Sequence, residues 1–560
     1  MGNAPARCLI VSDFTPGNFV GYLENDEASP ELEVVTGDFG QVVPLLAQPH
    51  LPAWQEKPEH VVVWTQPEKT IPSFQRTFDH QPAGSGEMLA EVDEYTGAIL
   101  QAAGRVKAVW VMSWVLDGER RGLGMADLRP GGAAYALQQM NARLVENLQG
   151  AANVFVLNAQ RWMQRAGKDA FAAKLWYQAK VPFGNMVFQE AVAEIKAGIR
   201  GLQGQARKLV IVDLDDTLWG GLVGDVGWEN VRVGGHDPAG EAFADFQRAL
   251  KALTRRGIIL GIVSKNDEAT ALNAVQQHPE MLLRKEDFAG WRINWRDKAA
   301  NVVELVSELN LGLQSVVFLD DNPVERARVR EALPEVLVPE WPENPQLYPN
   351  ALGSLRCFDA PIVSQEDAAR TQAYAAERQR TELKQSAGSP DEWLRGLNTV
   401  VEISPLNAAN LGRATQLFNK TNQLNLSTRR MTEAELNQWA AEPGRTLWAF
   451  RVSDKYGDSG ITGLASLEMR GTTGRIVDYI LSCRVMGRRV EEFMTNWLVT
   501  QAKQRGATKV VAEYLPTTKN KPCLEYWQRS GFAAESDHVF TWATTAEYPV
   551  PVAIHAHVIA

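Results

Sequence analysis

The sequence predicts a multidomain α/β protein whose central domain is built on a doubly wound parallel sheet. The chain has 560 residues, and because about 150 residues per domain is usual, this length predicts three or four domains. Short apolar segments alternate with helical stretches through the first two regions, which is typical of α/β folds. The last region places three strands ahead of a long helix, which predicts an α+β domain.

The composition describes an acidic globular chain. Apolar residues make up 45% and charged residues 22%, and 57 Lys and Arg stand against 67 Asp and Glu, for a net charge of −10. Such a chain, without a long basic run, is a poor candidate for binding nucleic acid or an anionic membrane. It has no apolar run of about 18 residues and no signal peptide at its start, and its 4 cysteines do not form a disulfide framework. We therefore expect a cytoplasmic protein.

The N-terminal domain is predicted to span residues 1–197. Apolar strands alternate with helices along it, and the polar, glycine-punctuated segment Gly198–Lys208 follows it. Its predicted strands are Cys8–Val11, His60–Trp64 and Val109–Met112, and its predicted helices are Gly86–Gly104 and Ala133–Leu148.

The central domain is predicted to span residues 205–365. Its strands are apolar on both faces, which fits the centre of a parallel sheet, and ligands of such sheets bind at the carboxyl ends of the strands. The predicted strands are Leu209–Leu214, Ile258–Val263 and Val316–Leu319. The predicted helices are Glu241–Arg256, Asp267–Gln277, Lys298–Leu309 and Pro323–Ala332.

A helical linker is expected at residues 366–390, and the α+β domain at residues 391–560. The expected strands of this last domain are Leu447–Val452, Thr462–Glu468, Ile476–Leu481 and Lys509–Glu513. Its expected helices are Val490–Arg505 and Leu524–Ser530.

The strongest motif follows the first strand of the central domain. VIVDLDDTLWGG places Asp213 and Asp215 two residues apart at the mouth of the sheet, with Thr217 and two glycines beyond them. One carboxylate there can attack phosphorus, and the other can protonate the leaving oxygen and later activate water. Because an anionic nucleophile is repelled by an anionic phosphate, this chemistry needs a divalent cation, and oxygen ligands suit Mg²⁺.

Further polar residues follow at the ends of later strands and at the start of a helix. Ser264 can hydrogen-bond a phosphoryl oxygen, Lys298 can neutralise its charge, and Asp320 with Asp321 can complete the metal site. Each also has a structural alternative: Ser264 as a helix N-cap, Lys298 as a solvated lysine, and Asp321 as the cap of the helix at Pro323. The four motifs are the Asp213–Asp215 pair, Ser264, Lys298 and the Asp320–Asp321 pair. Their occurrence together in this order favours the catalytic interpretation.

The central domain leaves little room for a lid over this site. The inserts from Thr217 to Glu241 and from Ser264 to Lys298 are too short to fold into a large cap. An open site suits a substrate that is carried on a protein or covered by a neighbouring domain.

The segment Leu209–Val338 resembles the haloacid dehalogenase superfamily of phosphotransferases. The resemblance implies that Asp213 is the nucleophile and a metal ligand, and that Asp215 is the general acid/base and offers its backbone carbonyl to Mg²⁺. It further implies that Asp321 ligates the metal directly and Asp320 directly or through water. The residues implied to bind phosphate are Thr217, Ser264 and Lys298.

Longer motifs along nearly the whole chain resemble the FkbH-like proteins. They are DLDDTLWGG, SKND, INWRDK, FLDDNPVER, NKTNQLNLSTRR and LSCRVMGRRVEE, with VSDFTPGNFVGYLE and DFGQVVPLL near the start. The resemblance implies a glyceryl-loading enzyme. Such an enzyme takes 1,3-bisphosphoglycerate, a small phosphorylated C3 substrate, removes phosphate, and delivers the glyceryl unit as a thioester to a phosphopantetheinylated acyl carrier protein for polyketide-type biosynthesis.

The N-terminal domain resembles an SGNH hydrolase that has lost its active site. Ser12 follows the first strand, where that fold carries its nucleophile, but Val-Ser-Asp replaces the usual Gly-Asp-Ser. The Asp-x-x-His expected near the end of the domain is replaced by DAFAAKLWYQAK. Since no general base accompanies Ser12, we expect a scaffold rather than a hydrolase.

The C-terminal domain resembles acyltransferases of the GNAT type. Their phosphate-binding loop is represented by Arg484 and Gly487, but Arg489 stands where a small residue is expected, which weakens the case for CoA. A phosphopantetheine arm without the nucleotide fits the same groove. Cys483 is the candidate acyl carrier, because Arg484 and a following helix N-terminus favour a thiolate. A buried structural role for Cys483 is the alternative, with Cys523 as the second candidate thiol.

Two other functions compete with glyceryl loading. A plain Mg²⁺-dependent small-molecule phosphatase would turn over without a carrier protein and without need of Cys483. A scaffold that docks a carrier protein would have a vestigial phosphatase site, which the four intact motifs disfavour.

Overall fold

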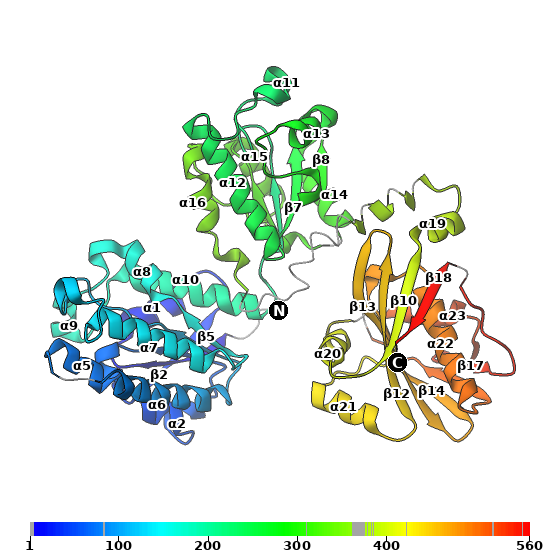
Figure 1. Ribbon diagram of the computed structural model, residues 1–560, viewed down its shortest axis with the longest axis horizontal. Coiled ribbons are helices and arrows are strands. Elements are labelled where there is room, and N and C mark those ends of the chain that lie inside the picture. Colours follow the sequence, from blue (N-terminus) through cyan, green and yellow to red (C-terminus); the bar gives the residue numbers. More distant parts are fainter. Residues whose placement is uncertain are drawn as a thin grey trace. The chain divides into compact units, whose positions relative to one another are not determined.

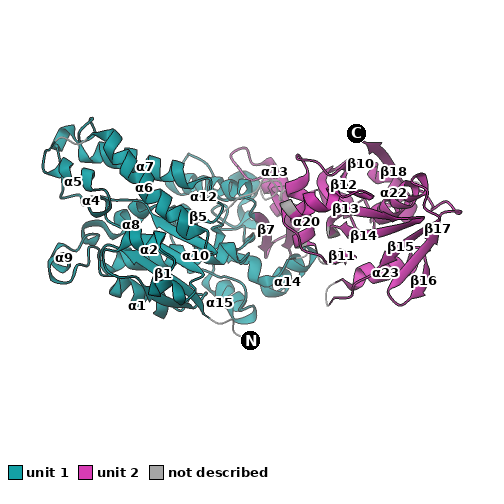
Figure 2. Ribbon diagram, turned by 90° about the horizontal axis from the view of Figure 1, so that it is seen from below, with its two compact units in different colours: residues 1–258, 295–367 teal, residues 259–294, 368–560 magenta. Residues whose placement is uncertain are grey.

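The computed structural model describes residues 5–81, 84–309, 311–360, 376–377, 379–381, 383–384, 386–421, 423–517, 520–551 and 553–559. The chain divides into two compact units (Figure 2). The first contains residues 1–258 and 295–367, and the second contains residues 259–294 and 368–560.

The first unit begins with a five-stranded parallel sheet in the order β2–β1–β3–β4–β5. The three predicted strands are confirmed as β1 (Ala6–Ser12), β3 (His60–Trp64) and β4 (Ala108–Met112). The sequence did not indicate the two edge strands, β2 (Leu32–Thr36) and β5 (Val154–Leu157). Both are only partly buried, so neither has the continuous apolar run that marks a central strand.

Helices cover both faces of this sheet, so that the fold is doubly wound (Figure 1). Alternate residues of β1, β3 and β4 belong to two separate cores. One core includes residues of α6, and the other includes residues of α10. The helices are α1 (Gly17–Asn25), α2 (Val42–Ala47), α3 (Pro52–Gln55), α4 (Pro67–Thr70), α5 (Pro72–Phe78), α6 (Ser85–Ala103), α7 (Ala133–Leu148), α8 (Ala159–Ala166), α9 (Ala173–Ala179) and α10 (Asn185–Leu202).

The boundary predicted at Gly198–Lys208 begins too early. α10 continues through Gly198 and Gly201 to Leu202, because its buried face extends as far as Ile199 and packs in the domain's core. The chain then reaches β6 (Leu209–Val212), which pairs in parallel with β9 (Val316–Leu319).

Five further helices of the first unit lie between Val223 and Gly353 in the sequence. α12 begins at Pro238 rather than at Glu241, because the Asp237 carboxylate accepts hydrogen bonds from the amides of Ala239 and Gly240. The helices are α11 (Val223–Val226), α12 (Pro238–Arg255), α14 (Lys298–Glu308), α15 (Pro323–Ala332) and α16 (Tyr348–Gly353).

The second unit contains β7 (Ile259–Ser264), α13 (Glu268–Gln277) and β8 (Phe288–Ile293), and β7 pairs in parallel with β8. Its larger part is a mixed sheet in the order β16–β17–β15–β14–β13–β12–β10–β18, with β11 paired to β14. The strands are β10 (Thr399–Pro405), β11 (Leu424–Asn425), β12 (Arg445–Asp454), β13 (Gly457–Arg470), β14 (Thr473–Leu481), β15 (Lys509–Glu513), β16 (Ala533–Ser536), β17 (Val539–Ala543) and β18 (Ile554–Val558).

The helices of the mixed sheet confirm the α+β prediction. α22 and α23 contribute to the same core as the strands, and a smaller core lies under α20 and α21. These helices are α19 (Pro390–Leu397), α20 (Leu411–Lys420), α21 (Glu433–Ala441), α22 (Val490–Gln504) and α23 (Lys521–Arg529). The first half of the predicted linker, residues 366–375, lies outside the described residues, and the described residues among 376–386 are helical.

Among the described residues, no helix combines the length and the apolar character needed to cross a bilayer.

Candidate active site

Four predicted site residues meet at one edge of the β6–β9 pair. Both strands are buried throughout, and Asp213 directly follows β6 while Asp320 and Asp321 directly follow β9. Lys298 is the first residue of α14. Because parallel strands bring their carboxyl ends to the same edge, residues far apart in the sequence come together there.

Lys298 bridges two of the carboxylates. Its Nζ lies 3.0 Å from Oδ2 of Asp213 and 2.6 Å from Oδ2 of Asp320. The lysine is only 3% exposed, so the alternative of a solvated side chain is wrong. Burial alone would lower the pKa of Lys298, but the two aspartates outweigh it and raise the pKa to about 12. The ammonium is therefore a fixed positive charge at this edge of the sheet.

The three aspartates form a cluster that fits a divalent cation. One carboxylate oxygen from each of Asp213, Asp320 and Asp321 lies within 4.8 Å of the others. Oδ1 of Asp213 is buried and has no hydrogen-bond partner among the described residues. Burial, with the adjacent Asp213, raises the pKa of both Asp320 and Asp321. One lysine leaves this oxygen-rich cluster two charges short of neutrality, and a divalent cation would supply them.

Thr217 and Arg326 hold the turn that carries Asp320 and Asp321. The Thr217 hydroxyl donates to Oδ1 of Asp321 at 3.1 Å and accepts from the Asp321 amide at 3.1 Å. Thr217 is thus placed against the acidic turn, and its expected contact with phosphate stays a prediction. Arg326 donates through Nη1 to the carbonyls of Asp320, at 2.8 Å, and Asp321, at 2.7 Å.

Sequence reasoning missed Arg326, although it lies within the motif FLDDNPVER. It follows Asp321 by five residues in α15, so its side chain reaches back over the first turn of the helix. The alternative of Asp321 as the helix cap is wrong, because Asn322 takes that position and accepts a hydrogen bond from the Val324 amide.

Asp215 lies next to the cluster in sequence, but its carboxylate does not belong to it. Oδ1 of Asp215 accepts hydrogen bonds from Nε1 of Trp219 at 2.9 Å and from the Val223 amide at 3.0 Å. These donors belong to the short insert that follows the motif. They orient the carboxylate, and its role as general acid/base stays a prediction.

Ser264 is the last residue of β7 in the second unit. It is 1% exposed, and its carbonyl accepts a hydrogen bond from the Asn294 amide at 3.1 Å. The alternative of a helix N-cap is wrong, because Asp267 caps α13 and accepts from the Thr270 amide. A role for Ser264 in binding phosphate stays a prediction.

In the N-terminal domain, the Ser12 hydroxyl is bonded to the backbone. The Ser12 hydroxyl donates to the carbonyl of Phe14 at 2.8 Å. Next to it, both carboxylate oxygens of Asp13 accept from the Gln66 amide, at 3.1 and 2.9 Å. Burial raises the pKa of Asp13 to about 7. The expected scaffold role of this domain stays a prediction.

The loop between β14 and α22 carries the C-terminal candidates. Cys483 begins its short 3₁₀ turn, Cys483–Val485, but the Cys483 side chain lies outside the described residues. Gly487 has a φ of +77°, and its amide donates to Oε1 of Glu491 at 3.0 Å. A carboxylate thus already holds the amide that was expected to bind a phosphate. Arg484 is exposed, and its carbonyl accepts from Nη2 of Arg488 at 2.6 Å.

Cys523 is a poor nucleophile in this fold. It is fully buried in the C-terminal core, and burial raises its pKa to about 12. Its thiol therefore stays protonated at neutral pH. Cys8 is equally buried, as expected for a residue of a central strand.

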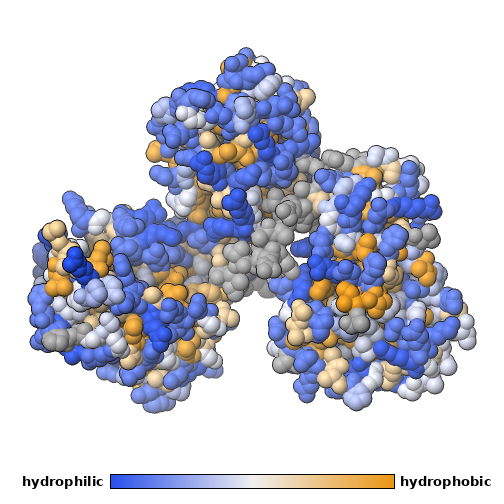
Figure 3. All heavy atoms as spheres, viewed as in Figure 1, coloured by the Kyte–Doolittle hydropathy of each residue, from blue (hydrophilic) through white to orange (hydrophobic). Residues whose placement is uncertain are grey.

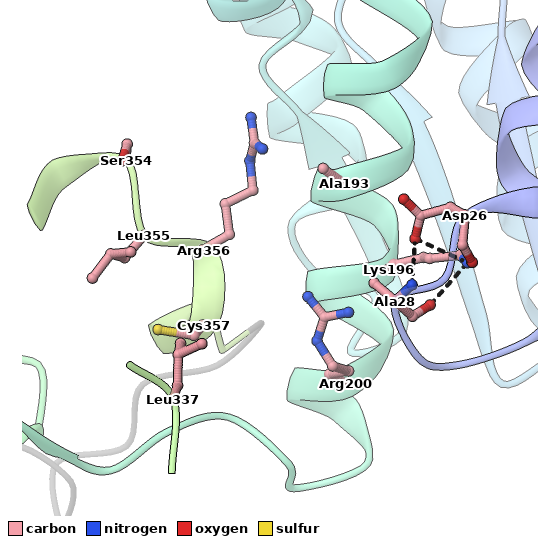
Figure 4. Close-up of a pocket in the computed structure, with 10 residues that line it drawn as sticks. All are labelled: Asp26, Ala28, Ala193, Lys196, Arg200, Leu337, Ser354, Leu355, Arg356 and Cys357. Carbon is pink, nitrogen blue, oxygen red and sulfur yellow. Dashed lines mark hydrogen bonds and ion pairs between the residues drawn. The ribbon is translucent and has the colours of Figure 1, made fainter. Parts of the chain in front are cut away.

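A hollow elsewhere in the first unit contains none of the cluster residues (Figure 4). It lies between α10 and the segment that contains Ser354 and Cys357. Lys196 on its wall is 1% exposed and donates to the carbonyls of Asp26 and Ala28, at 2.8 and 2.9 Å. This lysine ties α10 to the loop after α1.

A solved structure with a phosphatase domain is similar over 64% of this chain. No protein-family model and no curated protein matches the chain. The N-terminal part of the protein BF1531 from Bacteroides fragilis, which contains a phosphatase domain and was crystallised with Mg, is 28% identical with a TM-score of 0.59. The match covers 64% of this chain and 95% of that one. It supports a phosphatase-type α/β fold.

Two acetyltransferases match a smaller part of the chain. The ribosomal-protein-S18-alanine N-acetyltransferase of Escherichia coli is 9% identical over 26% of this chain and 94% of its own, with a TM-score of 0.21. The GNAT domain of S. lividans PAT is 13% identical over 25% of this chain and 89% of its own, with a TM-score of 0.21.

Proposed function

We propose that the protein is a Mg²⁺-dependent phosphatase of the haloacid dehalogenase type that works as a glyceryl-loading enzyme. It dephosphorylates 1,3-bisphosphoglycerate and transfers the glyceryl group to an acyl carrier protein as a thioester. The observation that carries the phosphatase part is the cluster of Asp213, Asp320 and Asp321 around Lys298. The similar BF1531 structure, with its phosphatase domain and Mg, supports the choice of metal.

The residues of the cluster have different roles in phosphoryl transfer. Bound Mg²⁺ would be held by Asp213, Asp320 and Asp321, with the carbonyl of Asp215, and would offset the charge of the phosphate. Lys298 holds Oδ2 of Asp213, which leaves Oδ1 without a partner among the described residues. Oδ1 is thus the oxygen placed to attack or to coordinate metal, while Thr217 and Arg326 keep the acidic turn in place.

The phosphatase reaction proceeds in two steps, formation and hydrolysis of an aspartyl phosphate. A carboxylate oxygen of Asp213 attacks phosphorus, the bond from phosphorus to the substrate oxygen breaks, and Asp215 gives that oxygen a proton. Water then attacks phosphorus of the aspartyl phosphate, Asp215 takes up a proton from it, and the bond from phosphorus to the Asp213 oxygen breaks, which releases inorganic phosphate and the carboxylate. Lys298 offsets the negative charge of the phosphoryl oxygens in both steps.

Acyl transfer uses the other phosphate of the substrate. The Cys483 thiolate attacks C1 of the acyl phosphate, the bond from C1 to the phosphate oxygen breaks, and phosphate leaves. The carrier's phosphopantetheine thiolate then takes the glyceryl group and releases Cys483. An acyl phosphate is already activated, so neither step needs ATP.

A plain small-molecule phosphatase is the second candidate, and the similarity to the BF1531 phosphatase domain favours it. It predicts phosphate release that is indifferent to Cys483 and to any carrier protein. Glyceryl loading predicts that the carrier acquires the mass of a glyceryl group.

Labelled 1,3-bisphosphoglycerate distinguishes the two functions. The full-length protein, Mg²⁺ and a phosphopantetheinylated acyl carrier protein are incubated with substrate labelled in the glyceryl unit. Intact mass spectrometry then follows both proteins while released phosphate is measured. We expect a glyceryl thioester on the carrier, and phosphate release without any acylated protein would refute the loading function.

The variant Cys483→Ala distinguishes acyl transfer from phosphate release. It should abolish the glyceryl adduct and carrier loading while phosphate release at the Asp213 site continues. Cys357→Ala, which removes a half-buried thiol elsewhere, is the matched control and should behave as the wild type. Carrier loading by Cys483→Ala at the wild-type rate would show that Cys483 is structural and that transfer goes directly to the carrier thiol.

A further inference from the structure

α9 in the N-terminal domain is a helix without a buried residue. Its sequence is AKLWYQA, and all seven residues, Ala173–Ala179, are at least partly exposed. Tyr177 is 81% and Leu175 39% exposed. Single exposed apolar residues are common, but short helices normally owe their stability to an apolar face packed against the protein. α9 presents Leu175, Trp176 and Tyr177 to its surroundings instead.

Lysines surround these side chains. Lys180 Nζ lies 4.9 Å from the ring centre of Trp176, and Lys69 Nζ lies 5.9 Å from it on α4. Within the described residues, neither of these lysines nor Lys174 forms an ion pair. From residue 161 to residue 180 the chain has five basic side chains and a single acid, Asp169. This local excess of positive charge stands out in a chain whose net charge is −10.

α9 lies at the ligand-binding edge of the N-terminal sheet. The carbonyl of Lys180 accepts a hydrogen bond from the Thr15 amide at 3.0 Å, which ties the end of α9 to the loop after β1. α4, which carries Lys69, follows β3. In parallel sheets, ligands bind at this carboxyl edge. Figure 1 shows α9 at the margin of the domain, and hydrophilic and apolar residues lie side by side there in Figure 3.

We propose that the α9 surface, formed by Lys69, Lys174, Leu175, Trp176, Tyr177 and Lys180, docks an acidic amphipathic helix of the carrier protein. This inference rests on the proposed function and names the site of its partner. Positive side chains around aromatic anchors suit a helix whose acidic residues flank an apolar stripe. The N-terminal domain would then position the carrier while the other domains perform the chemistry.

A direct binding titration tests the proposal. A fluorescently labelled, phosphopantetheinylated acyl carrier protein is titrated with the full-length protein, and anisotropy is followed at low and high NaCl. Tyr177→Ala should weaken binding by about tenfold or more, since aromatic anchors dominate interfaces. Lys174→Glu with Lys180→Glu should weaken it at low salt and flatten its salt dependence.

The control is Lys57→Glu, which reverses an exposed lysine just before β3, at the opposite edge of the same sheet. It should leave the affinity unchanged. Because no residue of α9 is buried, all of these variants should unfold at the wild-type temperature.

The outcomes separate the docking proposal from the proposed function. Wild-type affinity in Tyr177→Ala, or no binding of the carrier by the wild type, would overturn the docking site. Self-association of the wild type that Tyr177→Ala abolishes would also overturn it, by assigning the surface to a second copy. Binding that depends on Tyr177 without any transfer of glyceryl would overturn the loading function and keep the docking site. Glyceryl loading by Tyr177→Ala with an unchanged KM for the carrier would overturn the docking site and keep the loading function.

Discussion

Lys298→Met should destabilise the protein strongly, and Mg²⁺ should restore much of the loss. Nζ of Lys298 lies 3.0 Å from Asp213 and 2.6 Å from Asp320. At about 3 Å and an effective dielectric constant near 20, each contact is worth about 5 kcal/mol before the cost of desolvation. Removing one partner of a buried ion pair typically costs about 3–5 kcal/mol, because a buried charge is left without a partner.

The expected loss has a defined dependence on pH and metal. The folded pKa of Lys298 is raised from 10.5 to about 12, so its contribution is fully present below the unfolded value and is lost only as the pH rises through the folded value. The loss on substitution should therefore be close to constant between about pH 7 and pH 9. A divalent cation bound to the same carboxylates supplies the missing charge, so the loss should shrink in Mg²⁺.

Chemical denaturation with and without Mg²⁺ measures both effects. Lys57→Met removes an exposed lysine in the same unit and should change the unfolding free energy by less than about 0.5 kcal/mol. A loss below about 1 kcal/mol in Lys298→Met would contradict the buried ion-pair network. A larger loss that is the same with and without Mg²⁺ would show that the cation does not bind at these carboxylates.

Three further substitutions test the surroundings of the site and the N-terminal domain. Arg326→Met leaves two carbonyls of the acidic turn without their donor, so Mg²⁺ affinity measured by calorimetry should fall by about tenfold or more; unchanged affinity would contradict its positioning role. Thr217→Val removes the hydroxyl bonded to Asp321, at a cost of about 1–3 kcal/mol in stability, visible as a lower melting temperature; an unaltered melting temperature would argue against that bond. Asp13→Asn should stabilise the protein by up to about 4 kcal/mol at pH 8 and by little at pH 4. The folded pKa of Asp13 is raised to about 7, so its ionisation costs the folded state stability as the pH rises from the unfolded pKa through 7. Equal unfolding free energies of Asp13→Asn and wild type at pH 8 would refute the burial of that charge.

The sequence predicted the centre of the site because strand ends carry a strong signal. Buried parallel strands appear as unbroken apolar runs, and the residue after each run must lie at the ligand edge of the sheet. Asp213, Asp320 and Asp321 were found in this way, and their oxygens do lie within 4.8 Å of one another. The start of α14 placed Lys298 with equal success.

Contacts that reach across the fold could not be predicted in the same way. Arg326 acts through its reach back over α15, which depends on the rotamer of one long side chain rather than on spacing in the sequence. Thr217 bonds a residue 104 positions further along the chain. The partly buried edge strands β2 and β5 lacked an apolar run, and caps such as Asp267 and Asn322 were hidden by neighbouring polar residues that fit the same position equally well.

The measurement that most directly tests the aspartyl phosphatase site is the fate of phosphate in Asp213→Asn. The substitution removes the charge of the nucleophile at constant volume, and the fold should persist because Lys298 retains Asp320. Phosphate release from 1,3-bisphosphoglycerate in Mg²⁺ is compared with acid-quenched mass spectrometry of the peptide that contains residue 213. The aspartyl mechanism predicts a phosphorylated peptide in the wild type, and neither a phosphorylated peptide nor release of the C3 phosphate in the variant. Well-folded Asp213→Asn that still turns over at more than a few per cent of the wild-type rate would contradict it.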